Sequence, residues 1–313
     1  MMTVIVAPKY MNLRKLIVVA LSAIVALSGN VIFAEVAQTQ PGNSRRTFAD
    51  WCRQKADLSP EGKYTVEVLL KEAKTNECDA ADRKLSSLTQ LYLGNHRISD
   101  IKPLASLTNL KELYLHDNQL GDIKPLASLT NLTWLSLSLN PIGDIKPLAS
   151  LTNLTNLYLN ENQLGDIKPL ASLTNLKELQ LGNNRISDIK PLASLTNLTN
   201  LYLSLNPIGD IKPLASLTNL TSLTLINNRI SDIKPLASLT NLTWLFLYNN
   251  RISDIKPLAS LTNLTVLDLH DNQLGDIKPL ASLTKLTELS LSGNPIAPKT
   301  CPLKPESICK WEP

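Results

Sequence analysis

Aromatic residues are scarce in this chain of 313 residues: they make up only 4% of it, although 43% of the residues are hydrophobic. Such a composition is unusual for a globular core and favours a scaffold packed by leucine. Histidine is scarcer still, with three residues, which leaves few candidates for general acid–base catalysis. Because no nucleophile, base and orienting group come together at one place in the sequence, we expect no enzymatic activity and no cofactor.

Excess charge is also missing from most of the chain. Residues 85–298 hold 16 Lys/Arg and 16 Asp/Glu, so the net charge of +4 comes from the two ends. Proteins that bind nucleic acid carry a basic surface, and this neutral central region therefore argues against nucleic acid as a partner.

The dominant feature is a 22-residue unit that repeats from Leu85 to Ser282 without an insertion or deletion, with a partial tenth copy from Leu283. For example, residues 107–128 read LTNLKELYLHDNQLGDIKPLAS. A fixed period in this range indicates a solenoid, in which each unit buries its apolar face against its neighbours. We number the repeats one to ten and the positions within each repeat from 1 to 22.

Each repeat combines a strand pattern with two signals for irregular backbone. Positions 6 to 10 alternate between polar and apolar residues, which predicts a short strand with its leucines inward. Position 12 is asparagine from Asn118 to Asn294, and its amide is expected to satisfy buried backbone groups. Proline at position 19 excludes a regular α-helix over positions 16 to 22, so we expect an extended or 3₁₀ segment there.

The N-terminus has the pattern of a secretory signal. A basic start, an apolar stretch from Leu16 to Leu27 and a cleavage site near Ala34 predict a signal peptide over residues 1–34. The alternative is an uncleaved anchor, because residues 16–34 approach the length of a membrane span. Polar residues interrupt that stretch, so we expect cleavage and a secreted, periplasmic or cell-surface protein that is not inserted in a membrane.

The four cysteines flank the repeats, with Cys52 and Cys78 before them and Cys301 and Cys309 after them. Ten stacked strands at about 4.8 Å separate the two ends by roughly 40 Å, whereas the Cα atoms of a disulfide lie within ~7 Å. The sequence therefore predicts the bonds Cys52–Cys78 and Cys301–Cys309, which suit an oxidising compartment. A metal site is the alternative, but the ligand spacing and a nearby histidine are missing, so no metal is expected.

These signals divide the chain into five predicted segments. The signal peptide at 1–34 is followed by a flexible leader at 35–46 and by a helical, disulfide-bonded N-terminal cap at 47–84. The repeats occupy 85–298, and a disulfide-bonded C-terminal cap occupies 299–313. The caps are expected to cover the apolar cross-sections that a solenoid exposes at its ends.

The repeat frame, L-x-x-L-x-x-L-x-L-x-x-N-x-I/L-x-D-I-x-P-L-x-x, resembles the 22-residue leucine-rich repeat of internalins and of the phosphatase-regulating repeat proteins. The resemblance implies a curved leucine-rich-repeat solenoid with a concave parallel β-sheet and convex 3₁₀ or extended segments. It also implies a protein that acts by binding other proteins. The secreted, internalin-like branch is closer, because the regulators of phosphatases lack a signal peptide and disulfide-bonded caps.

Aromatic residues within the repeats occur only at positions 6, 8 and 10, which point away from the core on the inner sheet. Such side chains dominate the energetics of protein interfaces, and arginines at position 13 of repeats seven and eight border them. Repeat eight, with three aromatic residues, is the predicted centre. The candidate partner-binding residues are Tyr92, Tyr114, Trp134, Tyr158, Tyr202, Arg229, Trp244, Phe246, Tyr248 and Arg251.

The sequence thus predicts a monomeric, non-enzymatic scaffold that binds a protein ligand through its concave face. Two alternatives stay open: the aromatic row could stack on the rings of a carbohydrate, or the repeats could be a spacer whose length alone matters. The rows of Asp and Lys at positions 16 and 18 are interpreted as a solvated convex surface. The recurrent Asn-Leu-Thr triplets match glycosylation acceptors but are interpreted as repeat framework.

Overall fold

The computed structural model describes residues 46–312. The predicted signal peptide and residues 35–45 of the predicted leader lie outside the described residues, so the cleavage near Ala34 stays a prediction. Within residues 46–312, no helix is long and apolar enough to cross a membrane.

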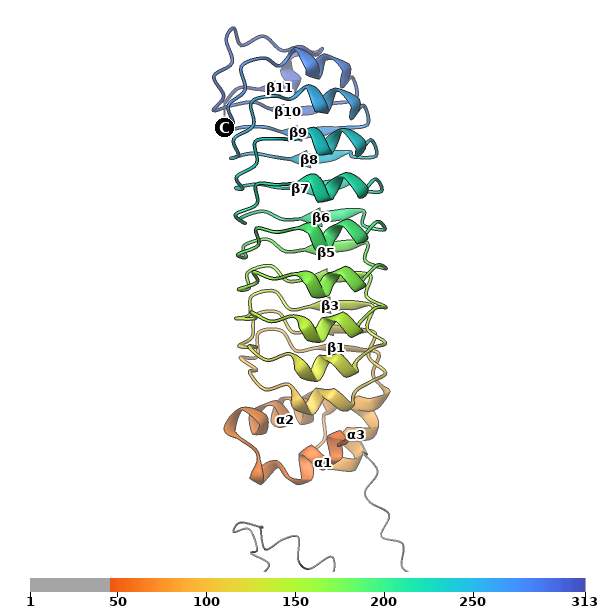
Figure 1. Cartoon of the computed structure of the whole chain (residues 1–313). Coiled ribbons are helices and arrows are strands. Elements are labelled where there is room, and N and C mark those ends of the chain that lie inside the picture. The colour runs from red at the N-terminus through yellow and green to blue at the C-terminus, as the bar shows by residue number, and fades with distance from the viewer. Residues whose placement is uncertain (1–45, 313) are drawn as a thin grey trace, which may run out of the picture. The chain divides into compact units, whose positions relative to one another are not determined.

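Three helices pack over the first repeat (Figure 1): α1 (Phe48–Arg53), α2 (Pro60–Ala73) and α3 (Cys78–Ser87). The first two begin where the sequence favours it; Ser59, for example, accepts a hydrogen bond from the Gly62 amide at 3.2 Å and so caps α2. The third helix has no counterpart in the sequence analysis, and it extends into repeat one. Hydrogen bonds tie the helices to the repeats: the Thr65 hydroxyl donates to the Asp100 carbonyl at 2.7 Å, and Asn109 Nδ2 donates to the Ser86 carbonyl of α3 at 2.8 Å.

The repeats form one parallel sheet in chain order, and each strand pairs only with its sequence neighbours (Figure 1). Equivalent positions face each other, as Leu113 faces Leu135. We expected ten strands, but the sheet has eleven, because two residues of the C-terminal cap pair with β10. The strands are β1 (Gln90–Tyr92), β2 (Glu112–Tyr114), β3 (Trp134–Ser136), β4 (Asn156–Tyr158), β5 (Glu178–Gln180), β6 (Asn200–Tyr202), β7 (Ser222–Thr224), β8 (Trp244–Phe246), β9 (Val266–Asp268), β10 (Glu288–Ser290) and β11 (Cys309–Lys310).

The opposite side of each repeat is a five-residue 3₁₀ helix of sequence KPLAS, from Lys102–Ser106 to Lys278–Ser282. This confirms the 3₁₀ prediction, and the proline sits near the helix start, where its missing N–H is not needed. The aspartate at position 16 has a role beyond the solvated surface that we predicted. In repeat two, Asp122 Oδ1 accepts a hydrogen bond from the Lys124 amide at 2.9 Å, and the other copies do the same.

The core is a continuous stack of leucine and isoleucine side chains, lined by a ladder of asparagines. Asn118 Nδ2 donates to the carbonyls of Leu93 and Leu115 at 2.7 and 3.0 Å, and Asn118 Oδ1 accepts from the Ile98 amide at 2.8 Å. Later copies repeat this pattern down to Asn294. The predicted role of position 12 is therefore confirmed.

The asparagine at position 3 forms a second ladder on the surface. Its Nδ2 donates to a carbonyl of the preceding repeat, as Asn131 does to Thr108 at 2.9 Å. The amide nitrogen that glycosylation would modify is thus already used in folding, which supports the framework interpretation of Asn-Leu-Thr.

Both predicted disulfides form. The Cα atoms lie 5.6 Å apart in Cys52–Cys78 and 5.8 Å apart in Cys301–Cys309. The first bond joins α1 to the start of α3, and the second holds β11 beside the last full strand. Each end of the solenoid is therefore covered by a covalently fixed segment.

Candidate binding face

The eight aromatic residues of the repeats all lie on the outward side of the sheet. Seven are in strands at positions 6 and 8, and Tyr248 follows β8 at position 10. The leucines between them are buried, so alternation along each strand places the aromatic rings on the face that solvent reaches. Whether these residues bind a partner stays a prediction, but the structure shows how they are grouped.

In repeats one to four the aromatic rings pack against one another. The ring centroids of Tyr92 and Tyr114 lie 4.5 Å apart with planes 12° from parallel, and those of Trp134 and Tyr158 lie 4.9 Å apart. A 6.2 Å contact between Tyr114 and Trp134 joins the two pairs. We call these four residues the aromatic ladder. Only the first pair is stacked face to face, whereas the planes of the other two pairs are tilted by 37°.

Two phenols of the ladder are shielded from water. Burial, with help from Glu112, which accepts a 3.0 Å hydrogen bond from the Tyr114 hydroxyl, raises the pKa of Tyr114 well above its usual range. Burial also raises the pKa of Tyr158 to about 12. Both phenols therefore stay neutral donors at physiological pH.

Repeat eight carries a second, more open group. Trp244 is 51% exposed, the largest exposure of the aromatic side chains on the sheet after the 56% of Tyr92. Beside it, Tyr248 stacks on His270 at 4.1 Å, and His270 Nδ1 lies 2.6 Å from Asp268 Oδ1. Tyr202, Trp244 and Phe246 are in no ring pair of the described chain. The predicted aromatic row is therefore the aromatic ladder of four rings, the Tyr248–His270 pair and three rings that stand apart.

The two predicted arginines do not join the aromatic rings. Arg229 and Arg251 are exposed at position 13, beyond the turn that ends each strand. Within residues 46–312 the only cation–π contact is that of Arg46 with Trp51 in the cap. Arg229 instead lines a shallow hollow of about 350 Å³ with Leu205.

Two leucines at the turn were not among the residues predicted from the sequence. Position 11 has a positive φ in every repeat, and most copies place Asn, Asp or Gly there, which tolerate this conformation. Leu139 and Leu205 have φ of 60° and 57° and are 45% and 50% exposed. A left-handed leucine costs about 1 kcal/mol, and its exposure adds no stability. The signal was visible as leucine at a position otherwise mostly polar or glycine.

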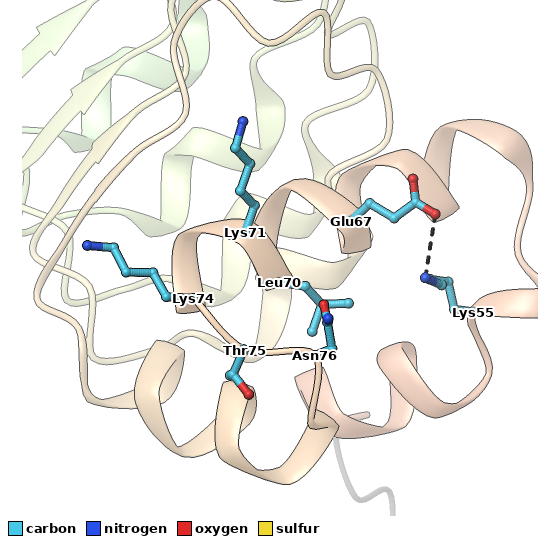
Figure 2. Close-up of a pocket in the computed structure, with 7 residues that line it drawn as sticks. All are labelled: Lys55, Glu67, Leu70, Lys71, Lys74, Thr75 and Asn76. Atoms are coloured by element: carbon cyan, nitrogen blue, oxygen red, sulfur yellow. Dashed lines mark ion pairs between the residues drawn. The ribbon is translucent and has the colours of Figure 1, made fainter.

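A hollow of about 450 Å³ lies in the N-terminal cap and is lined by three lysines, Leu70 and Asn76, among others. Lys55 pairs with Glu67 at 3.5 Å, and Figure 2 shows Lys71 and Lys74 pointing away from Leu70. Their ammonium groups do not converge on one point, so the hollow is not arranged to hold an anion.

Polar side chains near the aromatic residues are bonded to one another. Asn160 Oδ1 accepts from the Gly182 amide and its Nδ2 donates to Gln180, both at 2.7 Å. Asn156 donates to Glu178, and Asp268 contacts His270 as described above. Across the described residues no group of three or more His, Cys, Asp or Glu side chains is placed to hold a metal ion.

Comparison with known families identifies the repeats. A family model described as "Leucine Rich repeats (2 copies)" matches in eight segments between residues 86 and 304. An internalin of Listeria monocytogenes, inlF, is 42% identical, with a TM-score of 0.70 over 74% of this chain and 68% of that one. The chain belongs to the leucine-rich-repeat family and is of the internalin type.

Other solved structures resemble this internalin-like protein in fold. Internalin C2 of the same species is 39% identical, with a TM-score of 0.61 over 66% of this chain and 91% of that one. The ectodomain of an Arabidopsis thaliana receptor kinase, GASSHO1/SCHENGEN3, solved in complex with CASPARIAN STRIP INTEGRITY FACTOR 2, is 26% identical. Its TM-score is 0.60 over 68% of this chain and 28% of that one. No curated protein sequence matches the internalin-like chain.

Proposed function

We propose that this protein is a non-enzymatic, extracytoplasmic scaffold that binds a protein ligand through its concave face. The observation that carries the proposal is that every aromatic residue of the repeats lies on the solvent side of the sheet. A duplicated framework needs no aromatic residues there, whereas interfaces use them as anchors. Trp244, half exposed and beside Phe246, is the expected anchor.

The location and the binding mode have further support. Two disulfides suit an oxidising compartment. The receptor ectodomain named above was solved with a protein ligand, so a solenoid of this family can serve such binding. Core leucines and buried asparagines fix the backbone of this surface before a partner binds. The free-energy cost of ordering the surface on binding is therefore small.

Stacking on sugar rings is less well supported than protein binding. Sugar platforms expose ring faces and free acceptors, but Tyr92 and Tyr114 stack on each other, and Asn156 and Asn160 form hydrogen bonds with neighbouring groups. A glycan array is the direct comparison. Strong and selective glycan binding that Trp244→Ala abolishes would replace our proposal with the carbohydrate one.

The test of the proposal is capture of extracellular proteins by the immobilised full chain, with each captured protein then titrated against variants. The double variant Trp244→Ala with Phe246→Ala should lower the affinity for a specific partner by about thirtyfold, which is the effect of removing an interface anchor. Tyr64→Ala is the control, because Tyr64 is 43% exposed but lies in α2 rather than on the sheet. Equal affinity of both variants would refute the proposed face.

A separate variant addresses the spacer alternative. Deleting residues 173–194, one whole repeat, keeps the pairing register while it shifts the aromatic ladder relative to the aromatic residues of repeat eight. The deletion shortens the array by only about 5 Å, so a spacer would keep nearly all of its activity, whereas a protein-binding face should lose affinity.

A further inference from the structure

The ridge formed by positions 11 and 13, where the chain leaves each strand, has a pattern of its own. Its leucines, Leu139 in repeat three and Leu205 in repeat six, lie three repeats apart, roughly 14 Å at the spacing of parallel strands. They are the only aliphatic side chains among the large hydrophobic residues that are exposed within residues 46–312. Each borders a shallow hollow, of about 430 Å³ beside Leu139 and about 350 Å³ beside Leu205.

The charges beside the two leucines are opposite in sign. Asp117 and Glu161, in repeats two and four, flank Leu139, whereas Arg185 and Arg229, in repeats five and seven, flank Leu205. All four charged side chains are exposed, and no ion pair in the described chain includes any of them. The ridge therefore carries an acidic half and a basic half, each centred on a leucine.

This arrangement is self-complementary. A two-fold axis between repeats four and five would place repeat two opposite repeat seven of the other copy, repeat three opposite repeat six, and repeat four opposite repeat five. It would bring Asp117 to the level of Arg229 of a second copy and Glu161 to the level of its Arg185, each reciprocally, with the carboxylates at position 11 and the arginines at position 13. Repeat three would face repeat six, so that each leucine meets the other leucine and the hollow beside it. A closed dimer needs this reciprocal match.

We propose that two copies of this chain associate antiparallel through the ridge of repeats two to seven. The ends of the ridge limit the contact, because repeats one and eight would place Arg97 opposite Arg251, two like charges. Repeats two to seven are five spacings apart, roughly 24 Å, and a narrow ridge of that length buries less surface than the about 1,200 Å² of a stable interface. We therefore expect a reversible dimer that forms with rising concentration and weakens in salt. This differs from the monomer predicted from sequence, and it leaves the concave face open.

Sedimentation velocity of the full chain over a concentration series tests the proposal. Glu161→Arg alone, or Arg185→Glu alone, places like charges opposite each other twice in the dimer, and each should weaken association by about tenfold or more. An equimolar mixture of the two variants should restore it, because every pair is again opposite in sign. Lys190→Glu is the control, since it makes the same charge change as Arg185→Glu in the same repeat, on the 3₁₀ side.

The leucines give an independent arm, in which Leu139→Asn with Leu205→Asn should also abolish dimers while the chain stays folded by circular dichroism. The proposal is overturned if the wild-type chain stays monomeric throughout. It is also overturned if the single charge variants associate as strongly as the wild type, or if their mixture associates no better than either alone. None of these results bears on the concave face, whose test is the capture of a partner.

Discussion

The asparagine ladder makes a sharp prediction about stability, and Asn206 is a suitable residue to change. It is 4% exposed. Its Nδ2 donates to the carbonyls of Leu181, Leu203 and Ser204 at 2.9 to 3.1 Å, and its Oδ1 accepts from the Ile186 amide at 3.0 Å. The loss of these bonds would not be equally costly, because the carbonyls have a second hydrogen-bond donor and the Ile186 amide has no second acceptor.

The carbonyls would remain bonded after Asn206→Ala. Leu181 also accepts from Asn184, and Leu203 also accepts from Asn228. The Ile186 amide, in contrast, would be buried without a partner, at a cost of about 1–3 kcal/mol, and the lost carbonyl bonds add about 1 kcal/mol. We therefore expect Asn206→Ala to lower the free energy of unfolding by roughly 2–4 kcal/mol.

Urea unfolding followed by circular dichroism measures the loss, and amide exchange of Ile186 reports on the site itself. The control is Asn219→Ala, because Asn219 is exposed and makes a single bond, to the Thr196 carbonyl at 2.9 Å. It should lower the free energy by less than about 1 kcal/mol. If the two variants lose equal stability, the ladder does not hold the core as we describe.

The isosteric change Asn206→Asp separates the two halves of the side chain. It keeps an acceptor for Ile186 but points oxygen at the carbonyls of Leu181 and Leu203. The carboxylate would be buried and repelled, so its folded pKa should rise above the unfolded value, and the variant should regain stability as the pH falls. A variant with no such pH dependence would contradict the assigned orientation of the amide.

Three further predictions concern other parts of the chain. Because burial raises the pKa of Tyr158 to about 12 and that of Tyr114 well above the ordinary value of 10.0, their contribution to stability is complete below about pH 10. It is lost as the pH rises through the folded values, so replacing both with Phe should flatten the alkaline fall in stability measured by urea unfolding. Replacing Cys52 and Cys78 with Ser should cost about 3.5 kcal/mol in the same assay without reductant, as expected for a loop closed over 26 residues; an equal free energy of unfolding for the variant and the oxidised wild type would refute this. Leu205→Asn should raise the melting temperature of the monomer, because asparagine tolerates the positive φ; a lower melting temperature would argue against strain there.

The repeat frame predicted much of the fold because its signals recur at fixed spacing. Alternation around Leu113 marked a strand, Pro125 excluded an α-helix, and Asn118 marked a buried turn, and the structure confirms all three. Helix α3 was missed because only Ala81 and Leu85 of its residues are buried, too few to give an apolar period. Strand β11 was missed because two residues carry no alternation.

The candidate face was predicted less completely. Sequence placed the aromatic residues on one side of the sheet, but only coordinates show that Tyr92 stacks on Tyr114 while Trp244 stands open. The arginine at 229 was assigned to the aromatic residues by position alone, and its neighbour is Leu205 instead. Leucine at the turn was missed, because turn signals depend on Gly, Asn, Asp and Pro.

The covered ends of the sheet affect whether copies of the molecule can associate with one another at high concentration. Because all repeats share one register, an uncovered last strand would match the first strand of any other copy and could extend it head to tail without closure. Helix α3 lies before β1, and β11 occupies the edge of β10, held by Cys301–Cys309. Fibre growth would need both edges of the sheet to be open, so the helices before β1 and the segment held by Cys301–Cys309 each block it at a different end of the array.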